Sequence, residues 1–127
     1  MCSQKDIAER LLIRYQLPRY NLYMIKKYSH KKVTWLDLEN PTQEEARSLM
    51  REYSINPRVA EEFLSPSLKP KVDLYANFLF VILHFPALRH SHAQSINQEV
   101  DFLIGRDVII TVRYDSVDPL HEFSKIF

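Results

Sequence analysis

The stretch that decides the fold is residues 71–85, Lys-Val-Asp-Leu-Tyr-Ala-Asn-Phe-Leu-Phe-Val-Ile-Leu-His-Phe. Its β-branched and aromatic residues favour strands, and the pattern predicts them over 71–75 and 77–85, as two strands or as one with a break. In the second part the apolar side chains alternate between the two strand faces: Phe78, Phe80 and Ile82 on one, Leu79, Val81 and Leu83 on the other. We therefore expect a central strand that is covered on both sides.

Two hairpins are predicted, one on each side of this stretch in the sequence. The β-rich runs 97–104 and 108–114 are joined by Gly105-Arg106-Asp107, a three-residue turn that contains glycine. Earlier in the chain, the runs 21–28 and 33–38 are separated by a short polar stretch. We expect the lysines of this earlier hairpin to be solvated, because strand edges commonly have lysine.

The segment between the first hairpin and residue 71 has two helix signals. Thr42 and Glu45 form the pattern of a capping box, and apolar residues follow at helical spacing, which predicts a helix over 42–53. Asn56 followed by proline is a second start signal, for a helix over 57–64.

Two further amphipathic helices are predicted, over 6–16 and from Asp118 onward. The last helix has neither a glycine nor a proline stop signal, so we expect the sequence to continue in a longer protein. Together the elements predict an α/β (α+β) fold, with a mixed, mostly antiparallel sheet and helices packed on its faces. A length of 127 residues corresponds to a single domain over 1–127.

Composition and charge exclude several classes of protein. A net charge of +1 provides no electrostatic drive toward nucleic acid. The single cysteine, Cys2, excludes a disulfide scaffold, and the single glycine, Gly105, excludes glycine-rich phosphate loops. The longest apolar run, 78–83, is far shorter than the roughly 20 residues of a membrane-spanning helix. We expect a soluble, cytosolic chain.

The histidines do not form a convincing metal or catalytic site. His90 and His92 share one polar loop, but zinc sites typically have three or four ligands. His84 lies in an apolar strand and is expected to be a core histidine with a hydrogen-bond partner, whereas His30 and His121 are expected at the surface. The nucleophile motif Gly-x-Ser-x-Gly is missing from the sequence, and we expect no enzymatic activity.

Two adjacent glutamates, Glu61 and Glu62, lie near the end of the second predicted helix. Hard cations such as magnesium take oxygen ligands, usually one or two carboxylates with waters, so the pair is compatible with a cation site. A solvated helix end has the same pattern, and the pattern alone favours that interpretation.

Four sequence segments are informative through their order along the chain. They are Trp-Leu-Asp-Leu-Glu-Asn-Pro-Thr at 35–42, Ile-Asn-Pro at 55–57 leading to Val-Ala-Glu-Glu-Phe-Leu at 59–64, Lys-Pro-Lys-Val-Asp-Leu-Tyr-Ala-Asn-Phe-Leu-Phe at 69–80, and the hairpin 99–107 running into Val-Ile-Ile-Thr-Val-Arg at 108–113. In this order they resemble the cytoplasmic N-terminal domain of the CorA-like divalent-cation (magnesium/cobalt) transporters. The resemblance covers residues 33–127.

The resemblance implies a homopentamer in the full-length protein, with this domain beside long stalk helices that continue into the membrane pore. In that family, divalent ions bound between subunits hold the closed state. The matching positions here are Glu61 and Glu62, and their partner carboxylates would lie beyond Phe127, on the stalk of a neighbouring subunit. The pore helices and the Gly-Met-Asn signature are not in this sequence, so this fragment is not expected to conduct ions.

The resemblance favours the ion-sensing regulatory domain of a CorA-like transporter, at the cytoplasmic face of the cell membrane. Mg2+ or Co2+ would be the transported and regulatory ion, with no other cofactor and no nucleic-acid partner. The alternative is a stand-alone soluble protein-interaction module, and a hydrolase that uses carboxylates is a third hypothesis. Adjacent helix positions point about 100° apart, so we do not expect Glu61 and Glu62 to hold one ion together. With the partner chain absent, one carboxylate should hold a hydrated magnesium ion only weakly, so we expect no tight magnesium site in the fragment. We also expect Glu62 to be exposed rather than buried in a salt bridge.

Overall fold

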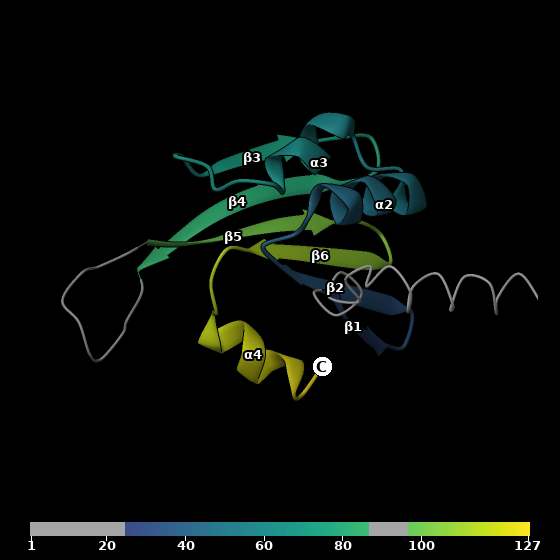
Figure 1. Cartoon of the computed structure of the whole chain (residues 1–127). Coiled ribbons are helices and arrows are strands. Elements are labelled where there is room, and N and C mark those ends of the chain that lie inside the picture. The colour runs from purple at the N-terminus through teal and green to yellow at the C-terminus, as the bar shows by residue number, and fades with distance from the viewer. Residues whose placement is uncertain (1–24, 87–96) are drawn as a thin grey trace, which may run out of the picture.

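The computed structural model describes residues 25–86 and 97–127, and in this part the chain forms one six-stranded sheet with helices on both faces (Figure 1). The elements are β1 (Ile25–His30), β2 (Val33–Glu39), α2 (Gln43–Tyr53), α3 (Pro57–Glu62), β3 (Lys71–Leu74), β4 (Leu79–Pro86), β5 (Asn97–Ile104), β6 (Val108–Arg113) and α4 (Asp118–Ser124). The predicted helix over 6–16, Cys2, and the loop with His90 and His92 lie outside the described residues.

The strand order is β1-β2-β6-β5-β4-β3. Neighbouring strands are antiparallel except for β2 and β6, which run parallel and join the two hairpins of the sheet. The prediction of a mixed, mostly antiparallel sheet is confirmed. The stretch 71–85 forms two strands, β3 and β4, linked by a turn in which the Tyr75 N–H donates to the Phe78 carbonyl at 2.8 Å.

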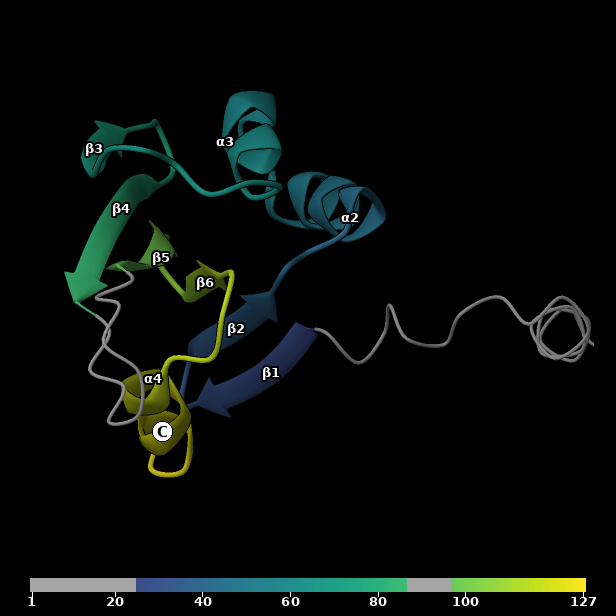
Figure 2. The same cartoon turned by 60° about the vertical axis from the view of Figure 1, so that its left-hand side comes forward.

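Helices α2 and α3 pack on one face of the sheet, and α4 lies against the other (Figure 2). The main core lies beneath α2 and α3, where sheet residues such as Leu38, Phe80 and Ile110 meet Val59 and Phe63 of the helical layer. Each of these five side chains is at most 1 % exposed. The core therefore fixes α3 to the centre of the sheet, which positions the end of α3 above β3 and β4.

Local signals for the helix starts are confirmed. The Thr42 hydroxyl accepts from the Glu45 N–H at 3.2 Å, and the Glu45 carboxylate accepts from the Thr42 N–H at 2.7 Å, which completes the capping box. The Asn56 side chain caps α3 through the Arg58 N–H at 2.9 Å. Gly105 begins the β5–β6 turn, and a Cβ at this position would lie 2.7 Å from the Phe78 ring, so the close approach of that ring requires glycine.

The expectation that the 77–85 strand is covered on both sides is wrong. Strand β4 is interior to the sheet, and its face toward α3 is fully buried, with Phe80 and Ile82 at 0 % exposure. On the opposite face Leu83 is 38 % exposed, and the neighbouring β3 residue Val72 is 65 % exposed. The reason is the position of α4, which packs over Trp35 of β2, with ring centroids of Trp35 and Phe123 5.6 Å apart.

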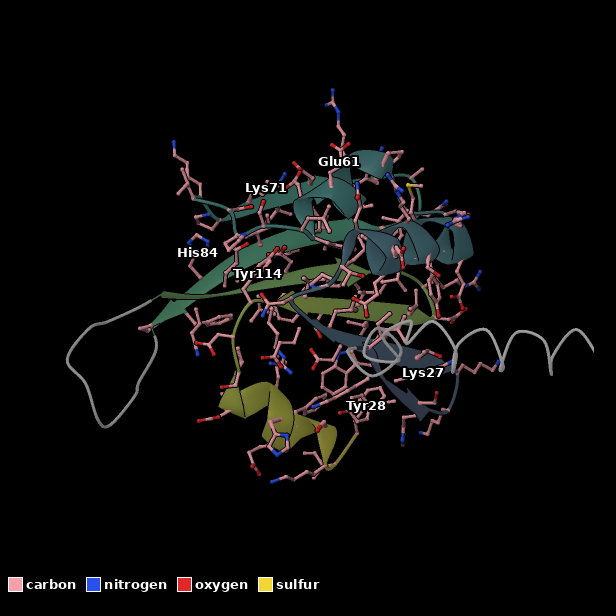
Figure 3. All side chains as sticks on the ribbon, viewed as in Figure 1. Lys27, Tyr28, Glu61, Lys71, His84 and Tyr114 are labelled. Carbon is pink, nitrogen blue, oxygen red and sulfur yellow. The ribbon has the colours of Figure 1, made fainter. Side chains whose placement is uncertain are left out.

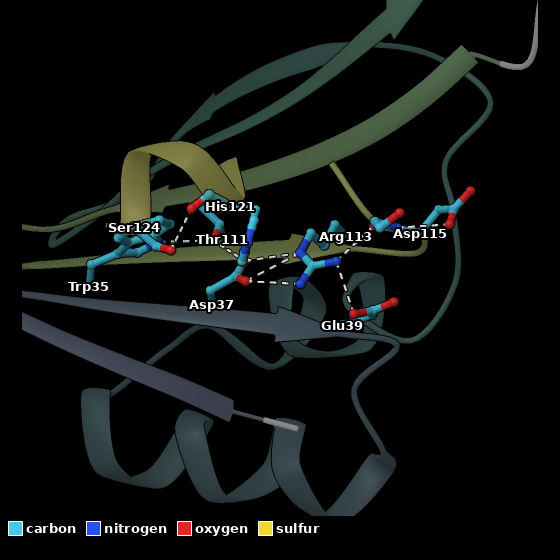
Figure 4. A network of polar contacts seen from close by, with 9 residues as sticks. Trp35, Asp37, Glu39, Thr111, Arg113, Asp115, His121 and Ser124 are labelled. Carbon is cyan, nitrogen blue, oxygen red and sulfur yellow. Dashed lines mark hydrogen bonds and ion pairs between the residues drawn. The ribbon is translucent and has the colours of Figure 1, made fainter. Parts of the chain in front are cut away.

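A buried polar network joins the parallel strands β2 and β6 on the α4 face (Figure 4). The Trp35 indole N–H donates to the Thr111 hydroxyl at 3.0 Å, which donates to Asp37 at 2.7 Å. Arg113 pairs with Asp37 at 3.2 Å and with Glu39 at 2.9 Å. Because every member has a charged or hydrogen-bonding partner, the network fixes the register of the parallel pair.

Candidate functional site

The two candidate glutamates, Glu61 and Glu62, lie on different sides of helix α3 and differ in their exposure to solvent. Val59, Ala60 and Phe63 face the core, which leaves Glu61 on the outer side of the helix, where Figure 3 shows it away from the sheet. Glu61 is exposed, whereas the side chain of Glu62 is 29 % exposed and turns toward β3. The two carboxylates therefore do not face one common ion.

Glu62 is held by a lysine of β3. The Lys71 Nζ atom lies 2.6 Å from Glu62 Oε1 and 3.1 Å from Asp73 Oδ2, and 5.3 Å from the centre of the Phe80 ring. Burial lowers the pKa of Lys71, but hydrogen bonds to Glu62 and Asp73 outweigh this effect and leave the pKa raised. Lys71 therefore stays charged and offsets part of the negative charge of Glu62 and Asp73. The expectation of an exposed Glu62 is wrong, because the ion pair with Lys71 leaves its side chain only 29 % exposed.

A ready-made metal site is not visible in the described part of the chain, where no group of three or more histidine, cysteine, aspartate or glutamate residues is placed to hold a metal ion. A hydrated divalent cation could contact Glu61 alone, and its other protein ligands would have to come from elsewhere. The end of α3 thus has one exposed carboxylate, that of Glu61, and a second carboxylate, that of Glu62, paired with an ammonium group.

A second polar cluster lies where the end of α3 meets the sheet. The Tyr114 hydroxyl, just after β6, is 3.0 Å from the Glu62 carbonyl oxygen, 3.0 Å from that of Ser65 and 3.2 Å from Asp101 Oδ2. Asp101, in β5, is fully buried. Tyr114 therefore connects the centre of the sheet to the backbone that follows Glu61 and Glu62.

Glu99, two residues before Asp101 in β5, contacts the backbone that follows α3 at Ser67. Both of its carboxylate oxygens accept from the Ser67 N–H, at 2.9 and 2.8 Å, and His84 Nε2 lies 3.1 Å from Oε2. His84 has the expected hydrogen-bond partner in Glu99, but with 20 % of its side chain exposed it is partly buried and not a core residue. His30 and His121 are exposed, as expected.

The surroundings in this cluster raise the pKa values of Asp101 and Tyr114. Burial raises the pKa of Asp101 to about 8, and the hydrogen bond with Glu99 and the negative charge of Glu99 act in the same direction, whereas the hydrogen bond with Tyr114 lowers it. Burial likewise raises the pKa of Tyr114, with the charge of Asp101 adding to the effect. Sequence reasoning missed this cluster, although one signal was present: Glu99 and Asp101 share a strand face with the apolar Leu103, which places two acids toward the core.

A family model described as CorA-like Mg2+ transporter protein matches residues 30–127. The chain belongs to the CorA-like Mg2+ transporter family. The match begins at the last residue of β1 and includes every described element after it, so the CorA-like residues include the strands from β2 onward, α3 and the polar residues around Lys71 and Tyr114.

The CorA-like chain is similar to two yeast magnesium transporters and to one archaeal CorA structure. It is 34% identical over 87 residues to the magnesium transporter ALR1 and 27% identical over 84 residues to the magnesium transporter ALR2, both of Saccharomyces cerevisiae. These matches cover 68% and 65% of the chain. The soluble domain of CorA from Methanocaldococcus jannaschii has the same fold, with a TM-score of 0.62, 18% identity and 75% of the chain covered.

The CorA-like chain corresponds to a small part of these proteins. It covers 9% of ALR1, 10% of ALR2 and 37% of the archaeal soluble domain. Among the residues that the structure describes, no helix is long and apolar enough to cross a membrane.

Proposed function

We propose that this chain is the ion-sensing, regulatory domain of a CorA-like divalent-cation transporter, located at the cytoplasmic face of the membrane. The observation that carries the proposal is the family match over residues 30–127, joined to an α3 that presents Glu61 outward and holds Glu62 beside Lys71. The fold shared with a CorA soluble domain supports it. We assign the domain no catalytic reaction.

The proposed mechanism is a shift of population between open and closed transporters. A Mg2+ or Co2+ ion that bridges an α3 carboxylate and a carboxylate of a neighbouring subunit in the closed state only would favour closure. Subunits of the same transporter, a pentamer in the full-length protein, are the proposed partners. Glu61 is accessible to such an ion directly, whereas Glu62 becomes available when the ion displaces Lys71.

The test uses the full-length protein in vesicles, with Mg2+ uptake followed as Mg2+ on the cytoplasmic side is raised. Glu62→Ala should require more Mg2+ for closure while leaving the thermal unfolding temperature nearly unchanged, because this ion pair is partly exposed and worth about 0–1 kcal/mol. Glu39→Ala is the matched control, since Glu39 is also half-buried and paired, with Arg113, but lies away from α3. Equal inhibition of Glu62→Ala and wild type would contradict the proposed role.

The alternative of a stand-alone interaction module predicts a different outcome. A full-length protein of that class would show no Mg2+ or Co2+ uptake in vesicles above that of empty vesicles. Uptake that responds to Mg2+ supports the transporter, and the Glu62→Ala comparison then tests the sensing role separately.

A further inference from the structure

The segment that links α3 to β3 is fastened to the sheet by buried groups. Tyr114 reaches the carbonyl oxygens of Glu62 and Ser65, and Glu99 receives the Ser67 N–H. These contacts join backbone 62–67 to β5 and to the end of β6. None of these three contacts includes the Lys71 ammonium group.

The Tyr114 hydroxyl has more acceptors than protons. Its single hydrogen faces two backbone carbonyls, at 3.0 Å each, and the Asp101 Oδ2 atom at 3.2 Å. Carbonyl oxygens only accept hydrogen bonds. When Tyr114 donates to a carbonyl, its contact with Asp101 is favourable only if Asp101 is the donor, and a carboxyl group donates only when it is protonated.

The surroundings of Asp101 favour its neutral form. Its side chain is fully buried, and within the described residues its Oδ1 atom has no hydrogen-bond donor. The charged and titratable groups that face it are Glu99 on β5, Tyr114 after β6 and Glu62 on α3. Of the nearby basic groups, His84 on β4 pairs with Glu99, and Lys71 on β3 pairs with Glu62 and Asp73. Two carboxylates this close in a buried site do not both ionise readily.

We propose that Asp101 keeps its proton at neutral pH, and that its neutral carboxyl group, Tyr114 and Glu99 form a proton-dependent clasp that holds segment 62–67 against the sheet. In the closed clasp, Asp101 is uncharged and the Tyr114 hydrogen is free for the Glu62 and Ser65 carbonyls. When the Asp101 proton leaves to a base in solvent, the new carboxylate attracts the Tyr114 hydrogen away from these carbonyls. The same charge repels Glu99 and weakens its contact with Ser67.

The raised pKa of Asp101, about 8, places this opening just above neutral pH. The inference does not depend on ion sensing at Glu61 and Glu62, although the clasp holds the backbone that follows them. It assigns the domain a response to alkaline pH, which is a property separate from the proposed function.

The experiment is NMR on the 127-residue chain, with two readouts. The first is the carboxyl carbon shift of Asp101, which should follow a titration midpoint near pH 8. The second is the hydrogen-exchange protection of the Ser67 amide, corrected for intrinsic rates. Protection should fall on the order of tenfold as the pH rises from about 7 to about 9.5, as expected for local opening.

The matched variants are Asp101→Asn and Asp107→Asn. The first replaces the acid by a neutral group that donates a hydrogen bond at every pH, so protection of Ser67 should stay constant to high pH. The second removes an exposed turn acid and should behave as wild type. The proposal is overturned by an Asp101 carbon that is already ionised at neutral pH, by wild-type protection that does not change with pH, or by the same transition in Asp101→Asn. The carbon titration needs no variant, so the proposal stays testable if Asp101→Asn does not fold.

Discussion

Lys71 is the residue that sets how available Glu62 is to a cation. Its ammonium group occupies the space between Glu62 and Asp73, at 2.6 and 3.1 Å, where a divalent ion would otherwise find two carboxylates. Any ion that uses Glu62 must therefore compete with an internal positive charge. Because of this competition, we expect the chain alone to bind Mg2+ only weakly.

Lys71→Gln should strengthen Mg2+ binding near α3. The substitution removes the competing charge and leaves two carboxylates without a counter-ion, and we expect affinity to rise about two- to fivefold, the scale of a partly exposed ion pair. Mg2+ titrations followed by the Glu62 and Asp73 carboxyl signals measure the change. Lys69→Gln, which removes an exposed lysine of the same segment, is the control and should not alter binding. Equal affinities in both variants would show that Lys71 does not compete with the ion.

Asp101 should make the chain less stable as the pH rises. The folded state binds the Asp101 proton more tightly than the unfolded chain does, since the pKa is 3.8 in the unfolded reference and about 8 when folded. Its stabilising contribution is therefore complete below pH 3.8, falls as the pH rises to about 8 and is constant above that. Urea unfolding across this range should show Asp101→Asn gaining stability relative to wild type as the pH rises. A difference that is independent of pH would contradict this sign.

At the scale of the elements, the two faces of β4 have different roles. The face toward α3 contains Phe80, whose ring lies 6.1 Å from that of Phe63 in an edge-to-face arrangement, both rings being fully buried. The opposite face is half-open because α4 packs over Trp35 of β2 and leaves Leu83 of β4 38 % exposed. Stability should therefore depend strongly on one set of side chains and weakly on the other.

Phe80→Ala should lower the free energy of unfolding by about 3–5 kcal/mol, as for other buried aromatic residues. Leu74→Ala, on the neighbouring strand but 83 % exposed, should change it by less than about 0.5 kcal/mol. Chemical denaturation of both variants measures the contrast. Similar losses in the two variants would mean that the burial of the sheet faces is not as described.

Sequence reasoning located the described strands, the hairpins and α2 and α3, because their signals are local. Each of these signals involves only a few neighbouring residues, as in the capping box of Thr42 and Glu45 and the cap formed by Asn56. Coverage of β4 was predicted wrongly because it depends on where α4 packs, and that is decided by contacts of Trp35 with Phe123 far along the chain.

Of the residues at the candidate site, the sequence pointed to Glu61 and Glu62 but not to Lys71 or Tyr114. Glu61 and Glu62 were singled out in sequence through a family resemblance, and the family is confirmed. Lys71 pairs with Glu62 across the turn region that follows α3, and Tyr114 lies 52 positions beyond Glu62. Such long-range pairings depend on strand order and register, and the periodicity of single segments contains neither.

At the scale of the whole molecule, the described chain leaves an apolar face on β3 and β4. Val72 and Leu74 are 65 % and 83 % exposed, and Ile126 after α4 is 80 % exposed. A groove of about 680 Å³, lined by Phe85, Val100, Phe102 and Leu120 among others, lies between α4 and the sheet on this side. Exposed apolar surface of this kind favours association.

The isolated chain should be a monomer or a weak dimer at micromolar concentration. The proposed pentamer of the full-length protein would depend on stalk and pore helices, whereas the exposed face offers a limited apolar contact. Light scattering measures the mass, and Leu74→Lys should shift any dimer toward monomer because it places a charge on the exposed face. A stable pentamer of the 127-residue chain would contradict this prediction.

The most direct test of the sensing role is the Mg2+ dose response of the full-length transporter with both α3 glutamates neutralised. In Glu61→Gln/Glu62→Gln, uptake into vesicles should persist at cytoplasmic Mg2+ concentrations that close the wild type, because neither carboxylate remains to bridge an ion. The control Glu44→Gln/Glu122→Gln removes two exposed glutamates on α2 and α4 and should close as the wild type does. A dose response of the Glu61/Glu62 variant that coincides with the wild-type curve would contradict the account.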